Sequence, residues 1–263
     1  MSKIPAAHGV EPVISPVIPD VRRFSLYLLG ATFLILLGLP VSAGERTERA
    51  LSLHSFDRVY VNGPLRVHLL QHTELPTHSH TDESRGAYVS GSAAGLDQLQ
   101  IEQADGTLYL DLSTGPAVDS DTRMTVFLPV EELKEIVSQG GAQIFAEQLA
   151  TPSLALEGQD AGQFIIERVL IDDLVIVGSG NTIFVLSGVV QNQLIELAGL
   201  GSFHGAALQS DTSHINIQGA GKVDVWAREL LQVSVLGAAR VRYDGSPWIY
   251  QQIQGSGAVT RIF

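Results

Sequence analysis

The chain contains no cysteine, and only 6% of its 263 residues are aromatic. The absence of cysteine excludes disulfides, thiolate metal sites and a cysteine nucleophile. Basic residues are also scarce: 16 lysines and arginines face 28 aspartates and glutamates, which gives a net charge of −12 at pH 7. An acidic chain without a basic block is a poor ligand for phosphate backbones, so we exclude nucleic acid as a partner.

An uncharged apolar run, Phe24–Leu39, directly follows Arg22 and Arg23, and small residues follow it up to Ala43. This order is typical of a secretory signal and predicts cleavage after Ala43. As a helix the run would reach about 24 Å, less than the ~30 Å hydrocarbon core of a membrane. We therefore expect an exported protein, periplasmic or at the cell surface, without a transmembrane domain once the signal is removed. An uncleaved N-terminal anchor is the alternative.

Glycine is abundant, with 26 residues, and in the second half of the chain it recurs about every 20 residues. A fixed period of this kind is the signature of a stacked repeat. The marker positions are Gly140, Gly158, Gly178, Gly199, Gly219, Gly237 and Gly255.

Alignment on these glycines brings aliphatic residues into one column, two places before each marker. That column contains Leu156, Ile176, Leu197, Ile217, Val235 and Ile253. Residues four places before the markers are also mostly aliphatic, whereas residues three places before them become polar along the chain. This alternation has the period of two that is expected for strands with one buried face. A further apolar column four places after the marker contains Phe203, Val223, Val241 and Val259, with Thr182 and Gly162 as exceptions.

These columns predict an all-β protein built as a parallel β-helix, or solenoid, of about seven coils. An antiparallel sandwich is the rival architecture, but it does not require like residues at a 20-residue period. No segment of the mature chain keeps a helical period over three turns, although Glu131–Ile136 could make one helical turn.

The expected organisation has three parts. Residues 1–43 are the signal peptide with a long N-terminal region, and residues 44–53 are a polar leader. Residues 54–263 form the β domain, in which a small strand region, 54–130, packs on or continues the coils of 131–263. Residues near 163–186 are apolar on both strand faces, and we expect the N-terminal strands to cover them, with a partner or second copy as the alternative.

One stretch of the chain resembles a known family. Phe56–Gln71, a strand pair near Leu99–Leu112, Met124–Pro129 with Leu133–Gly140, and the glycine-rich coils resemble the auto-transporter adhesin head domain, also called the GIN domain. The likeness covers roughly residues 54–260. It implies a bacterial cell-envelope protein with a β-helical fold and no established activity, and it offers no catalytic residues.

The candidate binding residues lie in the last coils. His204, Asp224 and Arg242 occupy one outward register in successive coils, and Lys222 and Arg240 lie two residues earlier. Stacking would place neighbours about 5 Å apart, so we predict a mixed-charge patch. A glycan or an acidic ligand suits such a patch, and a ladder of surface ion pairs is the alternative.

The same patch argues against catalysis by paired carboxylates. That chemistry needs two acids about 5–10 Å apart, and the patch contains only Asp224. We therefore expect no catalytic residue.

A second polar cluster contains His72, His78 and His80, together with nearby acidic residues. Imidazole and carboxylate groups bind Zn²⁺ or Ni²⁺. The spacing matches no metal motif, so we interpret the segment as a solvated loop and expect neither a metal nor a cofactor.

Taken together, the sequence predicts a non-enzymatic binding or interaction module of the cell envelope, adhesin-like in the form that the resemblance suggests. Its expected partners are a glycan or an envelope protein. The alternatives are a polysaccharide-active β-helix enzyme and a purely structural envelope protein.

Overall fold

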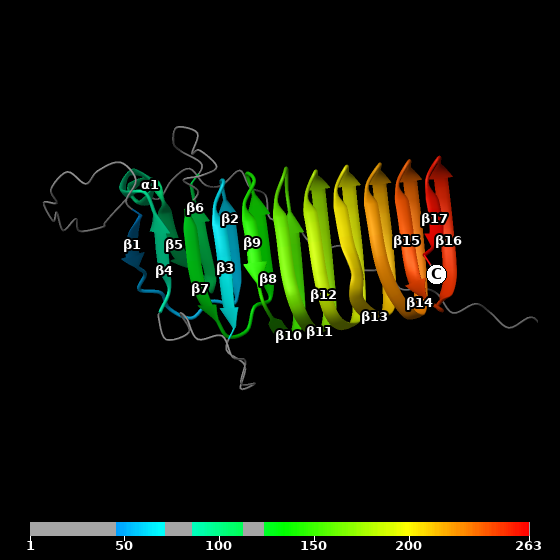
Figure 1. The fold of residues 1–263 in the computed structure, drawn as a ribbon, viewed down its shortest axis with the longest axis horizontal. Coiled ribbons are helices and arrows are strands. Elements are labelled where there is room, and N and C mark those ends of the chain that lie inside the picture. The colour runs from blue at the N-terminus through cyan, green and yellow to red at the C-terminus, as the bar shows by residue number, and fades with distance from the viewer. Residues whose placement is uncertain (1–45, 72–85, 113–123, 263) are drawn as a thin grey trace, which may run out of the picture. The chain divides into compact units, whose positions relative to one another are not determined.

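A computed structural model describes residues 46–71, 86–112 and 124–262. They form a parallel β-solenoid (Figure 1), which confirms the predicted fold class. The predicted signal peptide and the three loop histidines His72, His78 and His80 lie outside the described residues. Among the described residues, no helix is long and apolar enough to cross a membrane.

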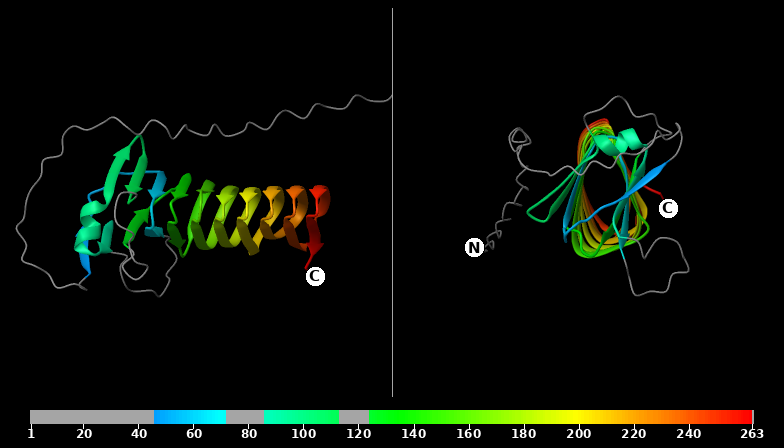
Figure 2. Two further views of the ribbon diagram at one scale, coloured as in Figure 1. Left: turned by 90° about the horizontal axis from the view of Figure 1, so that it is seen from above. Right: turned by 90° about the vertical axis from the view of Figure 1, so that its left-hand side faces the viewer.

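Long strands that bend at corners make the regular part of the solenoid. They are β10 (Leu149–Gly158), β11 (Gln163–Gly180), β12 (Ile183–Gly199), β13 (Ser202–Gly219) and β14 (Lys222–Gly237), followed by β15 (Arg240–Gly245), β16 (Trp248–Gly255) and β17 (Ala258–Arg261). The first halves of β11 to β14 stack with β15 and β17, and we call this side the first wall. The second halves stack with β10 and β16 and form the second wall. The end view in Figure 2 shows the two walls around one interior.

The N-terminal strands continue the two walls instead of covering them. These strands are β2 (Arg58–Asn62), β3 (Arg66–Gln71), β6 (Thr107–Asp111), β7 (Thr125–Val130), β8 (Glu135–Gln139) and β9 (Gln143–Ala146). Strand β2 lies in parallel between β6 and β8, and β3 lies in parallel between β7 and β9. The first coil in the sequence is therefore the second layer in space.

Antiparallel strands close the N-terminal end of the stack. Strand β4 (Tyr88–Gly91) pairs antiparallel with β7, β5 (Gln100–Ala104) with β6, and β1 (Thr47–Ala50) with β4. The short helix α1 (Ala93–Gln98) lies beside them and begins at Ser92, whose hydroxyl accepts a hydrogen bond from the Gly95 amide at 3.1 Å. A cap of this kind protects the edge of a solenoid from pairing with other chains. The sequence did not predict this helix.

The interior is filled by side chains stacked from turn to turn. One column of the first wall runs through nine layers: Val126, Val67, Ile144, Phe164, Phe184, Phe203, Val223, Val241 and Val259. The rings of Phe164 and Phe184 are stacked, with centroids 4.9 Å apart. The predicted inward residues of the second wall are also buried, since none of Ile176, Leu197, Ile217 and Val235 is more than 3% exposed.

The predicted alignment of the coils was wrong by two residues at its start. Ile176 pairs with Ile195, and Gly178 pairs with Leu197 instead of Gly199. The glycine that stacks on Gly199 is Gly180. The inward parity is correct because the error is an even number of residues. The same shift places Phe184, and not Thr182, in the column of Phe203.

The error arose because two kinds of glycine share the repeat. Gly180, Gly199 and Gly219 turn the corner with φ of 72°, 99° and 129°, where other residues are strained. A Cβ at Gly219 would also lie 2.4 Å from the carbonyl oxygen of Gly199. Gly178 has no such φ. Glycine is needed at this position because a Cβ there would lie only 2.7 and 2.9 Å from the side chains of Leu197 and Phe184.

Two smaller expectations were also wrong. The apolar outward residues near 163–186 are not covered by the N-terminal strands, which extend the stack end-on, and Val185 is 37% exposed. The segment Glu131–Ile136 forms no helical turn: strand β8 begins at Glu135, and Leu133 turns into the core with 1% exposure.

Candidate ligand-binding face

The five predicted residues lie together on the first wall and form the charged patch: His204, Lys222, Asp224, Arg240 and Arg242. His204 pairs in register with Asp224, and Asp224 with Arg242. Lys222 pairs with Arg240 in the next column. The glycine alignment placed these residues correctly because the markers of these coils are all corner glycines.

Asp224 is the centre of the charged patch. Its carboxylate accepts hydrogen bonds from Arg242 Nε at 2.6 Å and Nη2 at 2.8 Å, and His204 Nδ1 lies 3.3 Å from Oδ2. Burial by itself would raise the pKa of Asp224, which is 8% exposed, but the bonds from Arg242 and His204 outweigh it and lower the pKa below its ordinary value. Asp224 is therefore an anion that holds Arg242 in place.

Lys222 and Arg240 are exposed, and neither forms an ion pair with another described residue. The patch thus combines three cations, Lys222, Arg240 and Arg242, with the carboxylate of Asp224, which neutralises Arg242 and leaves the charges of Lys222 and Arg240 in excess. On a chain whose net charge is −12, this is a locally cationic surface. Only Arg242 is held in place, by its two hydrogen bonds to Asp224, so it loses less side-chain entropy on binding a ligand than a free arginine does.

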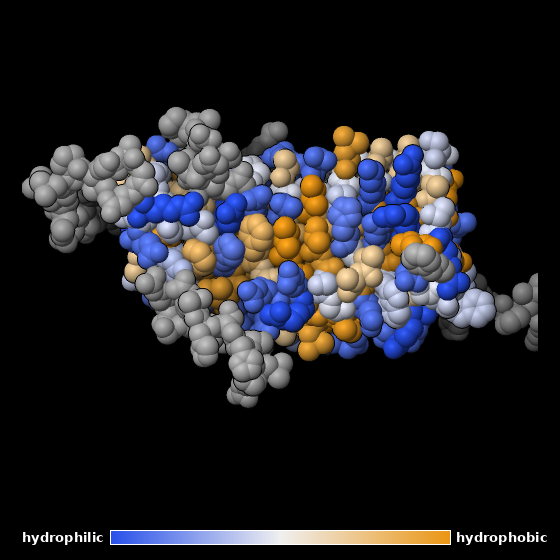
Figure 3. Space-filling view, in the orientation of Figure 1, coloured by the Kyte–Doolittle hydropathy of each residue, from blue (hydrophilic) through white to orange (hydrophobic). Residues whose placement is uncertain are grey.

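The column of Asp224 extends along the whole first wall. Before His204 it passes through Tyr88, Phe127, His68, Phe145, Ile165 and Val185. Figure 3 shows the resulting change of character, with apolar side chains over the middle of the solenoid and polar ones over the coils toward its C-terminal end. The sequence missed this column because half of it lies on strands with no glycine marker.

The aromatic members of this column contact one another face to face. Ring centroids are 4.5 Å apart for Tyr88 and Phe127, and 5.0 Å apart for His68 with each of Phe127 and Phe145. Since neighbouring rings cover one another's faces, these residues stabilise the wall and offer no open platform for stacking a ligand.

His68 makes the aromatic stack sensitive to acid. Burial between the two phenylalanines lowers its pKa, and the nearby Arg66 lowers it further. The folded state then binds a proton less readily than the unfolded chain. The free energy of unfolding is therefore highest above about pH 6.5 and decreases as the pH drops toward the pKa of His68 in the folded state.

We expect His68→Phe to remove this loss of stability at low pH, as measured by urea unfolding at about pH 7.5 and about pH 5. His214→Gln is the control, and an unchanged pH dependence in His68→Phe would contradict the assignment.

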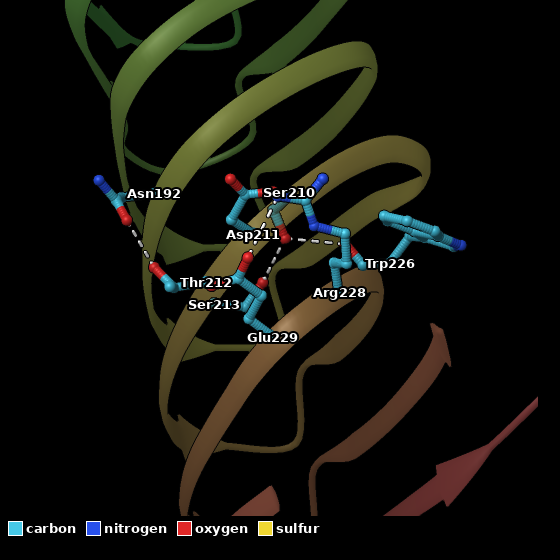
Figure 4. Close-up of polar contacts among 8 residues, drawn as sticks. All are labelled: Asn192, Ser210, Asp211, Thr212, Ser213, Trp226, Arg228 and Glu229. Carbon is cyan, nitrogen blue, oxygen red and sulfur yellow. Dashed lines mark hydrogen bonds and ion pairs between the residues drawn. The ribbon is translucent and has the colours of Figure 1, made fainter. Parts of the chain in front are cut away.

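The corner opposite the glycines carries a polar cluster that the sequence also missed (Figure 4). Inside it, Gln193 Nε2 donates to the hydroxyls of Ser210 at 3.0 Å and Ser213 at 2.6 Å. On its surface, Arg228 forms an ion pair with Asp211 at 2.8 Å. These contacts join successive turns where the strand register shifts, so we interpret the cluster as support for the corner.

The geometry defines a class of protein: a capped parallel β-solenoid whose rigid walls present ladders of side chains. A family model described as "Putative auto-transporter adhesin, head GIN domain" matches residues 55–247. The chain belongs to this family, as the resemblance in its sequence indicated.

Solved structures with the same fold come from the bacteria Bacteroides fragilis and Parabacteroides distasonis. A "putative adhesin" from Bacteroides fragilis is 20% identical, with a TM-score of 0.75, and the match covers 84% of this chain and 98% of that one. A "putative lipid binding protein" and a "putative adhesin", both from Parabacteroides distasonis, are 17% and 19% identical with TM-scores of 0.64 and 0.62 and the same coverage. No curated protein sequence matches the chain.

Proposed function

We propose that this protein is an exported, non-enzymatic binding module of the cell envelope that uses the charged patch to hold acidic polymers, as an adhesin would. The observation that carries the proposal is the pair of exposed cations, Lys222 and Arg240, beside the fixed Arg242. Membership of an adhesin head family supports the location and the class of function.

The chemistry of Asp224 favours binding over catalysis. A general acid must carry a proton at the working pH, whereas the bonds to Asp224 lower its pKa. The patch also lacks the second carboxylate that glycoside hydrolysis requires. Its charges suit the recognition of carboxylate or sulfate groups at repeated intervals along a polymer.

The test measures binding of the purified protein to polygalacturonate, a polymer of carboxylated sugars, with poly(ethylene glycol), an uncharged polymer without sugar rings, as the reference polymer. We expect the double variant Lys222→Glu/Arg240→Glu to bind polygalacturonate about tenfold more weakly or worse. Binding by the unmodified protein should also weaken as salt is raised from about 0.05 M to about 0.5 M, because exposed charges are screened.

Arg46→Glu/Arg49→Glu, which makes the same two changes of sign at exposed positions at the other end of the solenoid, is the matched control and should bind normally. Equal binding by the double variant and the unmodified protein would overturn the proposal. Turnover of the polymer that disappears in Asp224→Ala would favour a polysaccharide-active enzyme instead. Cross-linking in whole cells that recovers only envelope proteins would favour a structural role.

A further inference from the structure

A separate groove crosses the second wall beside the glycine corner. Its volume is about 490 Å³, and it spans five successive strand segments, from the end of β11 to β16. Two neighbouring outward columns border it: Val177, Glu196, Asn216, Ser234 and Gln252, and Ser179, Ala198, Gln218, Leu236 and Gln254. We call it the amide groove. Stacking repeats its side chains at intervals of about 4.8 Å.

The side chains that give the amide groove its name are open to a ligand. Asn216, Gln218, Gln252 and Gln254 are exposed, and the only side-chain hydrogen bond that they make to a described residue is the long one from Asn216 Nδ2 to Glu196 Oε1, 3.5 Å. Each amide offers two donors and one acceptor oxygen.

Several amides elsewhere on the solenoid surface are paired along their columns. Gln143 donates to Gln163 at 3.1 Å, Asn192 to Asp173 at 2.9 Å, and Gln191 to Asp172 at 2.5 Å. Such pairs hold neighbouring turns together and leave little hydrogen-bonding capacity for a ligand. The amides of the groove keep theirs.

The composition of the amide groove limits what it can recognise. Glu196 is its only ionisable residue, so it has no cation to hold a phosphate, sulfate or carboxylate. It also has no aromatic residue or arginine, the side chains that usually anchor a protein partner. Its outward apolar side chains are Val177, Ala198 and Leu236, of which Leu236 is 55% exposed; Leu197, Ile217 and Val235, which also line the groove, are buried in the core.

We propose that the amide groove binds an uncharged, hydroxyl-rich glycan chain lying across successive turns. Sugar hydroxyls both donate and accept hydrogen bonds, as the amides and Ser234 do, and the aliphatic side chains pack against the C–H faces of the sugar rings. This site differs from the charged patch in wall, residues and ligand charge.

The test titrates the purified protein with neutral gluco-, xylo- and manno-hexasaccharides by calorimetry. It also follows the side-chain amide signals of asparagine and glutamine by NMR. We expect at least one neutral hexasaccharide to bind and to shift amide signals of the groove. The variant Asn216→Ala/Gln252→Ala should weaken that binding about tenfold or more. Gln209→Ala, which removes an exposed amide outside the groove, should bind as the unmodified protein does.

The two proposed sites fail independently. Binding of neutral sugars that is lost in Lys222→Glu/Arg240→Glu, or that survives in Asn216→Ala/Gln252→Ala, would overturn the amide groove as the site. Failure of every neutral hexasaccharide to bind would also overturn it, even if polygalacturonate binds the charged patch. Displacement of groove signals by a peptide or by self-association alone would assign the groove to a protein partner instead.

Discussion

Replacing Ile217 by aspartate is expected to lower the free energy of unfolding by more than about 3 kcal/mol. Ile217 is 1% exposed and lies in register between Leu197 and Val235 in the interior of the second wall. A carboxylate there would meet aliphatic neighbours and no cation. It would have to lose its charge or force the turns apart. Urea unfolding followed by circular dichroism measures the change.

Asn216→Asp is the matched control, because it brings the same carboxylate to the adjacent residue on the outer face. Asn216 is exposed beside Glu196, where water screens the added charge, so the expected change is within about 0.5 kcal/mol. Equal tolerance of both substitutions would contradict the inward assignment of Ile217 and, with it, the assignment of the second wall's outer face.

Phe184→Ala is expected to destabilise the protein by about 3–5 kcal/mol. Phe184 has no exposed surface and lies in register between Phe164 and Phe203. Both neighbours come from rigid strands of adjacent turns, which limits how far the core can collapse into the space left behind. Thermal and urea unfolding would measure the loss.

Val185→Ala is the comparison, since Val185 follows directly in β12 but is 37% exposed. Its expected cost is below about 1 kcal/mol, because little apolar surface leaves the core. A double-mutant cycle between Phe184 and Phe203 should show coupling of more than about 0.5 kcal/mol. Additive effects of the two substitutions would contradict the corrected register, which places Phe184 beside Phe203.

The register of the later coils could be predicted because the glycines that turn the corner also mark equal positions in successive coils. Gly199, Gly219, Gly237 and Gly255 all turn the same corner, so aligning them also aligned the residues between them. That is why the prediction placed Asp224 beside Arg242. The alignment failed at Gly178, where glycine is required by the packing of a neighbouring side chain and not by φ. A sequence pattern cannot distinguish these two reasons for glycine.

The amide groove could not be predicted in the same way. Gln218 and Gln252 occupy outward positions, as Gln143 and Asn192 do, and in the sequence all four look like ordinary solvated residues. The difference is whether a side chain in the next turn forms a hydrogen bond with the amide. This depends on the exact residue-by-residue register of the two strands.

The sequence by itself determined the class of fold and its inward and outward faces, because a period of two within a period of about twenty has one compact solution. It also determined the charged patch, since stacking brings equal positions of successive coils together. Only the tertiary structure decided the order of the N-terminal layers, in which β2 and β3 lie between strands that follow them in the chain. Strand pairing there depends on contacts between residues far apart in sequence, and no local pattern encodes which strands those are.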